Sequence, residues 1–189
     1  MTTIRTRTGL VPLVDDLRRT VGAADEPAPA VAAALRVGAP PAATLLDPVE
    51  LAGRRGPRAG SILLHAETGF SIVAIVWRPG QATSIHDHLA WCVVAVLAGC
   101  EHETTYRRGH KNELVANAET RNGVGSVTAL TPPGDIHRVR NLDADIAVSL
   151  HVYGADLGVA GSSVRRIYDV HPGTFAIARI RDVTEPAGS

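Results

Sequence analysis

The sequence has few aromatic residues and no excess of charge of either sign. Aromatic residues make up 4% of its 189 positions, and 19 basic side chains balance 19 acidic ones, so the formal net charge is zero. Nucleic acids and anionic bilayers attract proteins through clustered Lys and Arg, and a balanced charge offers no such attraction. We therefore expect no nucleic acid and no membrane surface among the partners of this protein.

Long hydrophobic runs and cysteines are also scarce. No run approaches the roughly 18 consecutive apolar residues of a membrane-spanning helix, and residues 1–10 lack the apolar stretch of a secretory signal. Cys92 and Cys100 are the only cysteines, too few for a disulfide framework, and we expect them to be reduced thiols. These absences predict a cytoplasmic protein.

The chain divides into two parts that differ in composition. The first sixty residues are rich in Ala and Pro, and apolar residues at helical spacing predict helices over residues 10–21 and 30–37. From residue 61 on, short β-branched runs are separated by Gly, Pro and Asn, a pattern typical of strands. These runs cover residues 61–65, 70–77, 91–97, 124–130 and 145–153, with a less regular run at 175–180. We expect a single domain in which residues 1–60 form a helical segment packed on an all-β sandwich or barrel of residues 61–189.

Three of the eight histidines lie in distinctive surroundings. His86 and His88 are two positions apart in a run that follows Pro79 and Gly80. On a strand, residues two apart face the same side, roughly 7 Å from each other, so a divalent metal ion fits between these two imidazoles. His137 follows a Pro-Gly turn, and a histidine after such a turn is by itself more often a loop residue than a ligand.

The two histidine segments together resemble the motifs of the cupin superfamily. The first motif matches at Gly80, His86, His88 and Gly99, and the second matches at Gly125, Pro132, Gly134, His137 and Asn141. The resemblance implies a double-stranded β-helix, or jelly-roll barrel, that holds a metal ion on His86, His88 and His137.

One position departs from the superfamily pattern. Most cupins carry a glutamate ligand where this chain has Cys92. Without that carboxylate, three neutral imidazoles leave the metal ion its full dipositive charge and up to three open coordination positions. Such a site can bind a bidentate anionic substrate and dioxygen together.

In this departure the chain resembles the thiol dioxygenases, a branch of the cupin superfamily that comprises the cysteine dioxygenases and the 3-mercaptopropionate dioxygenases. Residues 77–88, Trp91 and residues 136–139 resemble these enzymes, and residues 149–154 resemble their Ser-His-Tyr relay. Ser149, His151 and Tyr153 alternate along one strand, so their side chains share a face and can hydrogen-bond in sequence toward the metal. The resemblance covers residues 61–169. It implies an Fe(II)-dependent enzyme that adds both atoms of O2 to the sulfur of a small thiol carboxylate to give a sulfinic acid.

The same resemblance implies roles for four further residues. Gln81 matches the glutamine of the mercaptopropionate-type enzymes, and residues 165–169 resemble the segment whose arginine holds the substrate carboxylate, which leaves either Arg165 or Arg166 in that role. Cys92 matches the cysteine that the animal enzymes join to the active-site tyrosine by a thioether. A Cys92–Tyr153 crosslink is therefore implied, with a small thiol packed in the β-core as the alternative.

Other functions fit parts of the pattern. A cupin with a non-redox metal could isomerise or hydrolyse a small acid, and a non-catalytic cupin could bind a small ligand. Three imidazoles also suit Ni, Mn, Co or Zn as well as Fe(II). The sequence leaves open which thiol acid is the substrate, and whether the protein is a monomer or a homodimer.

Overall fold

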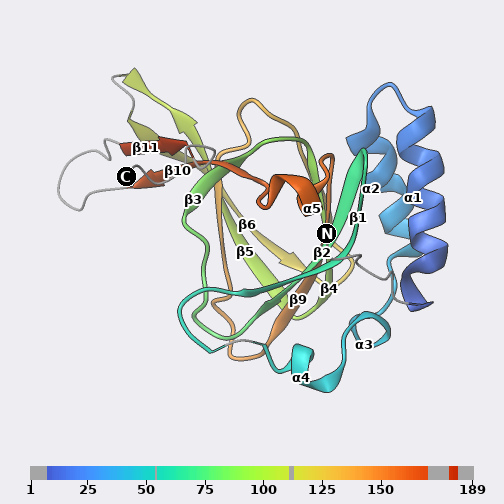
Figure 1. Ribbon diagram of the computed structural model, residues 1–189. Coiled ribbons are helices and arrows are strands. Elements are labelled where there is room, and N and C mark those ends of the chain that lie inside the picture. Colours follow the sequence, from blue (N-terminus) through green and yellow to red (C-terminus); the bar gives the residue numbers. More distant parts are fainter. Residues whose placement is uncertain (1–7, 54, 111–112, 170–178, 183–189) are drawn as a thin grey trace, which may run out of the picture.

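Two antiparallel sheets form the main body of the computed structural model, which describes residues 8–53, 55–110, 113–169 and 179–182 (Figure 1). The first sheet has the order β1-β2-β9-β4-β7 and consists of β1 (Gly60–Glu67), β2 (Phe70–Trp77), β9 (Ala147–Tyr153), β4 (Cys92–Ala98) and β7 (Val127–Leu130). The second has the order β11-β10-β3-β8-β5-β6 and consists of β11 (Arg179–Asp182), β10 (Val164–Asp169), β3 (Ile85–His88), β8 (His137–Arg140), β5 (Cys100–Arg108) and β6 (Leu114–Gly123).

Successive strands alternate between the two sheets along most of the chain. From β2 onward the path runs from the first sheet to β3 in the second, returns to β4, and crosses again for β5 and β6, then for β7, β8, β9 and β10 in turn. This winding is the double-stranded β-helix that the motifs predict, and the predicted cupin fold is confirmed. The first motif's Gly99 makes the turn from β4 to β5 with a φ of +65°, and a Cβ there would lie 2.6 Å from the Ile146 carbonyl oxygen.

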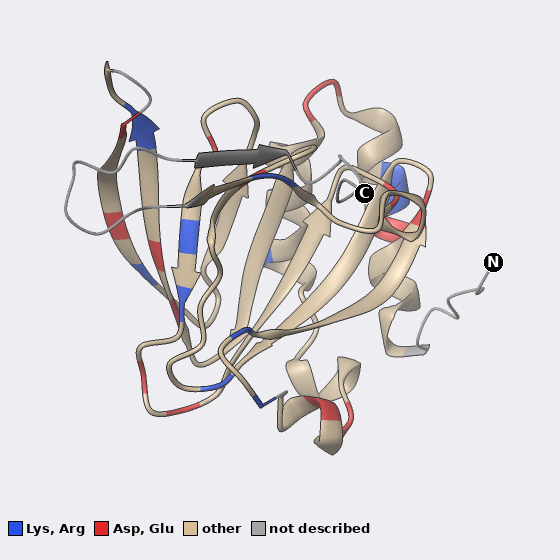
Figure 2. Cartoon of the chain, turned by 60° about the vertical axis from the view of Figure 1, so that its left-hand side comes forward, with Lys and Arg blue, Asp and Glu red and all other residues tan. Residues whose placement is uncertain are grey.

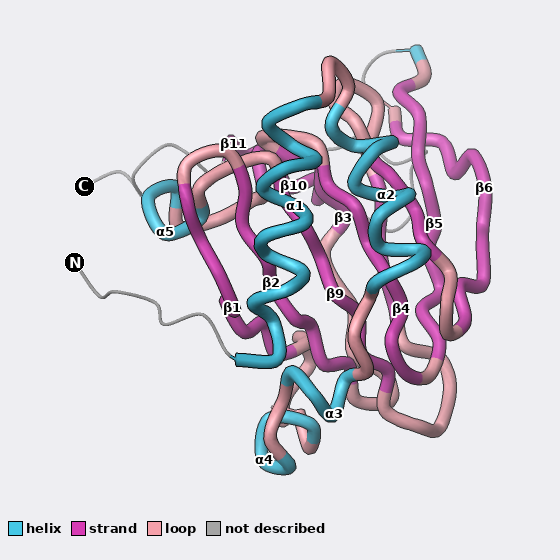
Figure 3. Tube along the Cα trace, turned by 90° about the vertical axis from the view of Figure 1, so that its right-hand side faces the viewer, coloured by secondary structure: helices cyan, strands magenta, loops and turns pink. Residues whose placement is uncertain are grey.

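Helices α1 and α2 of the first part of the chain cover the outer face of the first sheet, and α3 and α4 lie beyond its end (Figure 3). The helical elements of this part are the 3-10 turn η1 (Thr8–Leu10) and helices α1 (Val11–Ala23), α2 (Pro27–Gly38), α3 (Ala42–Leu45) and α4 (Pro48–Leu51), and α5 (Leu157–Ala160) follows β9. Leu17 of α1 and Val31 of α2 are fully buried in one apolar cluster with Leu150 and other residues of the first sheet. The helices therefore share their core with the sheet they cover.

The three central strands of the first sheet, β2, β9 and β4, are buried on both faces, which explains their strongly apolar sequences. Along β9, Leu150 and Val152 face the helices, and the residues that alternate with them face the space between the two sheets. That inner face of β9 carries Ser149, His151 and Tyr153, which are all buried. The alternation of a strand thus places three polar side chains inside the protein.

The sequence did not indicate strands β5 and β6. Both are rich in polar residues. β6 is an edge strand whose side chains are mostly exposed, whereas β5 lies between β8 and β6 and buries polar residues such as Glu101 and Glu103. Figure 2 shows acidic and basic residues interspersed along these outer strands and in the loops. Of the run expected at 175–180, residues 175–178 lie outside the described residues, and 179–182 form β11. In the described part of the chain, every helix is too short or too polar to cross a membrane.

Candidate metal centre

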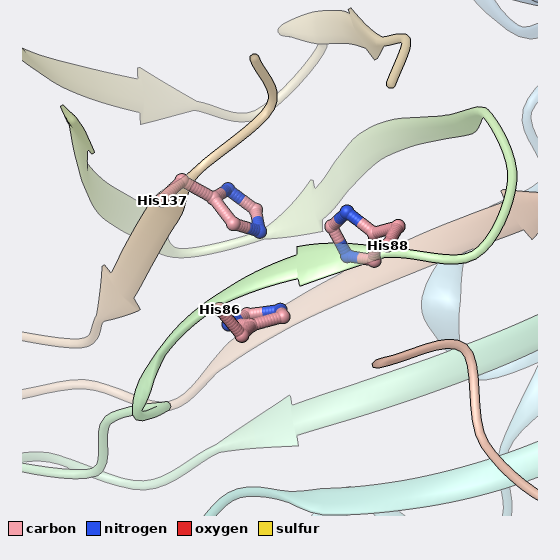
Figure 4. Close-up of side chains that lie close together, drawn as sticks. All are labelled: His86, His88 and His137. Carbon is pink, nitrogen blue, oxygen red and sulfur yellow. The ribbon is translucent and has the colours of Figure 1, made fainter. Parts of the chain in front are cut away.

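His86, His88 and His137 converge between the two sheets (Figure 4). One ring nitrogen of each lies within 4.8 Å of those of the other two. The ring centroids are 4.6 Å apart for His86 and His137, and 4.9 and 5.0 Å apart for the other two pairs. His86 and His88 share one face of β3, and β8 pairs with β3 so that His137 lies directly opposite His86. Strand pairing therefore brings the third imidazole to the two that the sequence already places together.

The Nδ1 atom of each imidazole is held by an acceptor from the protein. The contacts are His86 Nδ1 to the Ser84 carbonyl at 3.0 Å, His88 Nδ1 to Asp135 Oδ2 at 3.0 Å, and His137 Nδ1 to Glu103 Oε1 at 2.7 Å. An imidazole that donates from Nδ1 leaves Nε2 free of a proton and able to bind a metal. The Nε2 atom of His137 is buried and has no hydrogen-bond partner among the described residues, as a ligand atom would require.

Electrostatics keep the imidazoles of His86 and His88 neutral. Burial lowers the pKa of His86 well below its usual value, and the neighbouring His137 and His88 lower it further. Burial also lowers the pKa of His88, although Asp135 opposes the shift. Burial by itself would raise the pKa of Asp135, but the hydrogen bonds and charge of His88 outweigh it, so that this pKa is lowered. Neutral rings beside an ionised Asp135 suit a divalent cation.

Asp135 and Glu103 hydrogen-bond to imidazoles of the triad but are not members of the three-histidine group. Each carboxylate contacts the Nδ1 side of a ring, and the three-histidine group contains no carboxylate. Sequence reasoning missed both residues. Asp135 was visible two positions before His137 in the second motif, whereas Glu103 lies on β5, a strand that the sequence did not indicate.

Ser149, His151 and Tyr153 form a hydrogen-bonded series that ends beside the triad. Ser149 Oγ is 2.9 Å from His151 Nε2, and Tyr153 Oη is 3.2 Å from His151 Nδ1. The Tyr153 ring centroid lies 5.8 Å from that of His88. Burial lowers the pKa of His151 to about 3 and raises the pKa of Tyr153 well above its usual value, so both groups are neutral. Trp77 adds a link that the sequence did not indicate, because its Nε1 donates to Ser149 Oγ at 3.1 Å.

Cys92 lies directly opposite Tyr153 on the neighbouring strand β4. Both side chains are in the same buried cluster, and Cys92 is 1% exposed. The Cys92 Sγ atom is 3.8 Å from His151 Nδ1, the atom that Tyr153 also contacts. Burial raises the pKa of Cys92 well above its usual value, and the hydrogen bond with Tyr153 only partly offsets this. The thiol and the phenol are therefore neighbours inside the protein.

Arg165 and Arg166 are not brought to the triad. Arg165 donates from Nε at 3.3 Å and from Nη2 at 2.7 Å to Asp87, which lies between the two β3 histidines but faces the other way. Arg166 lies opposite Asp87 in the register of β10 and β3. Both arginines line a pocket with Arg108 and Tyr106, away from the three imidazoles.

Gln81 is held by backbone groups of other segments. It is 2% exposed, it donates from Nε2 to the carbonyls of Gly56 and Arg58 at 2.8 Å each, and it accepts from the Arg78 backbone N–H at 2.8 Å. Its contacts hold the segment that leads into β1.

A cavity of about 280 Å³ lies beside His86. Its lining includes Ser61, Trp77, Ser84, Val164 and Ile167, together with Arg58, the sole cation among the described residues that line it. Arg58 precedes β1 and lies ahead of both sequence motifs, so motif matching did not indicate it. The cavity has the size of a small-molecule site and offers a guanidinium at its wall.

The fold and the three-histidine centre define a cupin with a site able to bind a metal ion. The chain belongs to the cysteine dioxygenase type I family, because the family model of that description matches residues 58–159, more than half of the chain. The curated cysteine dioxygenase type 1 proteins of Rattus norvegicus and Mus musculus are each 31% identical to it over 88 residues, 44% of this chain and 44% of each relative. The chain thus matches less than half the length of these relatives.

Solved cupin structures also resemble this chain. A cupin superfamily protein from Desulfitobacterium hafniense has a TM-score of 0.46 at 14% identity, covering 62% of this chain and 90% of its own. A Cupin 2 conserved barrel domain protein from Salinispora arenicola has a TM-score of 0.44 at 20% identity, covering 61% and 92%.

Proposed function

We propose that this protein is an Fe(II)-dependent thiol dioxygenase that adds both atoms of O2 to the sulfur of a small thiol carboxylate and yields a sulfinic acid. The observation that carries the proposal is a buried three-histidine centre without a carboxylate ligand, set beside the Ser149, His151 and Tyr153 series. Membership of the cysteine dioxygenase type I family supports the same chemistry. Cysteine and 3-mercaptopropionate are the substrates to compare.

His86, His88 and His137 would hold the iron. Bound there, Fe(II) would supply a redox-active centre that favours the thiolate form of a substrate and activates dioxygen. Because all three ligands are neutral, the charge of the ion is left for an anionic substrate to balance. Asp135 and Glu103 keep the rings in the tautomer and orientation that binding needs.

Arg58 is the residue we propose for the substrate carboxylate. Its position in the wall of the cavity beside His86 supports this role, because a guanidinium can pair with a carboxylate through two hydrogen bonds. Arg165 is engaged by Asp87, and Arg166 lines a different pocket. The sequence-based assignment to residues 165 or 166 is therefore replaced in this proposal by Arg58.

Tyr153 would orient the polar part of the substrate. Its hydroxyl lies at the end of the series from Ser149 and His151, and its ring lies beside His88. The series fixes the rotamer of the phenol, and the burial of all three side chains excludes water from the reacting groups. A thioether to Cys92, whose thiol is a neighbour, would fix the ring further.

Oxygen consumption by the iron-loaded protein tests the proposal. We expect uptake of one O2 for each sulfinate formed from cysteine or 3-mercaptopropionate, measured with an oxygen electrode and by mass spectrometry of the product. A His137→Ala variant should lose iron and activity together, whereas the matched His65→Asn variant, which alters a histidine bonded to Glu67 on β1, should keep both. A protein that holds zinc and ignores dioxygen with every small thiol would overturn the proposal.

A further inference from the structure

Cys100, His102 and Asp143 form a second group of side chains suited to a metal ion, here called the Cys100 cluster. One ring nitrogen of His102, the Cys100 Sγ atom and one carboxylate oxygen of Asp143 all lie within 4.8 Å of one another. A zinc ion held tetrahedrally at about 2.0–2.3 Å from sulfur, nitrogen and oxygen separates those ligand atoms by about 3.3–3.6 Å. His102 Nε2 is already 3.7 Å from Asp143 Oδ1. Small side-chain rotations therefore bring the cluster to the spacing that a metal ion requires.

Two segments that are far apart in the sequence supply the cluster. Cys100 and His102 are two positions apart on β5, so their side chains share one face of that strand. Asp143 lies in the loop between β8 and β9. Its backbone N–H donates at 3.0 Å to Oδ1 of Asn141, a fully buried side chain that itself donates to the Trp77 carbonyl at 3.0 Å. The fold thus fixes the position of both segments before any ligand binds.

The Cys100 cluster is separate from the three-histidine centre. Glu103 follows His102 on β5 and therefore faces the other side of the second sheet. On that side, Glu103 Oε1 accepts from His137 Nδ1 at 2.7 Å. A metal ion in the Cys100 cluster would thus lie across β5 from an ion held by the triad.

The donor atoms of the cluster are available to a cation. His102 Nδ1 is buried and has no hydrogen-bond partner among the described residues. Asp143 Oδ2 accepts from Arg121 Nη2 at 2.8 Å, which leaves Oδ1 near His102. Carboxylates that bind metals are commonly held in this way by a hydrogen bond from a neighbouring residue. The carboxylate is therefore oriented and still has one oxygen to offer.

Two arginines flank the cluster in the register of the second sheet. Arg121 lies opposite His102 on β6, and Arg140 lies opposite it on β8. Arg140 Nη2 is engaged by Thr104 Oγ1 at 3.1 Å. Positive charge nearby disfavours a metal ion on neutral ligands, so the ion needs both the carboxylate and a thiolate. Burial raises the pKa of Cys100, and the charge of Arg121 opposes the rise and so favours the thiolate.

We propose that Cys100, His102 and Asp143 bind a second divalent metal ion, of the kind that prefers thiolate and imidazole ligands, with zinc as the first choice. Such a ligand set selects zinc over the harder magnesium and calcium ions. When the ion binds, the S–H bond of Cys100 breaks, its proton passes to solvent, and the electron pair that stays on sulfur forms the metal–sulfur bond. No oxidation state changes. The Asp143 side chain is 35% exposed, so a water molecule can reach the fourth position. The ion joins β5 to the loop between β8 and β9, and this role does not depend on the dioxygenase function.

Cobalt(II) tests the site, because a cobalt-bound thiolate gives an intense near-ultraviolet absorption band that imidazole ligands do not give. Titration of the metal-free protein with Co(II) should produce this band. His137→Ala, which lacks a ligand of the triad, should produce it equally. Cys100→Ser should lack the band and still bind one cobalt ion at the triad, and Cys92→Ala, the matched change at the other cysteine, should keep the band.

Zinc affinity tests the carboxylate ligand. In the His137→Ala background, zinc binding measured by chelator competition reports on the Cys100 cluster. Asp143→Asn should weaken this binding about 10-fold or more, since even a residue that only positions a ligand contributes that much. Glu119→Gln alters a carboxylate of the edge strand β6 that is 73% exposed, and as the matched control it should leave zinc affinity unchanged.

The outcomes are distinct from those that test the dioxygenase. Absence of the thiolate band in both the wild type and His137→Ala overturns the inference and leaves His102 and Asp143 as a pair without a metal. A band that survives in Cys100→Ser and disappears in Cys92→Ala assigns the thiolate ligand to the triad and also overturns it. Should Cys100→Ser fail to fold, the band in His137→Ala and in Cys92→Ala decides the question. Zinc that Cys100→Ser releases belongs to the cluster, and it is no evidence against iron at the triad.

Discussion

Cys92 and Tyr153 face each other across the pairing of β4 and β9, inside the space between the two sheets. This relationship places a thiol and a phenol beside the imidazole of His151, which both of them contact. A thioether between sulfur and ring replaces one S–H bond and one ring C–H bond. The two protons and two electrons released would pass to dioxygen at the iron-loaded centre.

The crosslink leads to the first prediction. Protein that has turned over thiol with iron and dioxygen should contain a form lighter by two hydrogens than the sequence mass, and the peptides of Cys92 and Tyr153 should be joined. Cys92→Ala should lack this form and should retain activity at a reduced rate, because the phenol is then held only by hydrogen bonds. An intact mass equal to the sequence mass after many turnovers would contradict the prediction.

Glu103 should determine how tightly the metal is held. Its carboxylate accepts from His137 Nδ1 at 2.7 Å, and the loss of such a partner lowers metal affinity by about 10- to 100-fold. Glu103→Gln should therefore bind Fe(II) or Co(II) more weakly by that factor in a chelator competition. Glu119→Gln should bind with wild-type affinity, and equal affinities for the wild type and Glu103→Gln would refute the role of this carboxylate.

Arg58 should set the affinity for the substrate carboxylate. Charge-assisted hydrogen bonds contribute about 1.5–3 kcal/mol, so Arg58→Ala should raise KM for a thiol acid about 10- to 100-fold with a smaller change in kcat. Arg58→Lys should lie between, since it keeps the charge without the paired donors. The matched variant Arg166→Ala should leave KM near the wild-type value. A KM that rises in Arg166→Ala and not in Arg58→Ala would assign the carboxylate to the arginine on β10.

His151 should make the metal-free protein sensitive to acid. Burial lowers its pKa to about 3 from a usual value near 6.5, so the unfolded chain binds a proton there more readily than the folded chain. The contribution of this residue to stability is complete above about 6.5 and is lost as the pH falls from that value toward 3. Thermal unfolding at about pH 7 and about pH 5 should show a smaller drop in Tm for His151→Gln than for the wild type. The same drop in both proteins would argue against a buried neutral imidazole.

Particular residues show how far the sequence can predict this site. His86 and His88 were predictable from strand periodicity alone, since two positions along a strand return to the same face. The prediction that His137 binds the same metal ion came from a resemblance to known motifs, because local spacing says nothing about residues about 50 positions apart. Ser149, His151 and Tyr153 were likewise predicted as one strand face, and their hydrogen bonds have the predicted order.

The residues that sequence reasoning missed, and the predicted substrate contacts Arg165 and Gln81, make contacts of another kind. Arg165 carried a charge suited to a carboxylate, but its partner is Asp87, which the register of β3 and β10 places within reach. Gln81, which the sequence predicts as a substrate contact, bonds in the structure to backbone groups of residues 56, 58 and 78. In both cases the competing partner lies within the protein itself and belongs to another segment of the chain.

By itself the amino-acid sequence determined which side chains share a strand face, where the chain turns, and that the second part of the chain is β-rich. These properties follow from the period of the backbone and from the preferences of Gly, Pro and β-branched residues, all of which act over a few positions. Only the tertiary structure decided which carboxylates bond to the Nδ1 atoms of the imidazoles and which arginine lines the cavity beside His86. Those contacts join segments that are far apart in the sequence, and their geometry is set by how the strands pair and how the sheets pack.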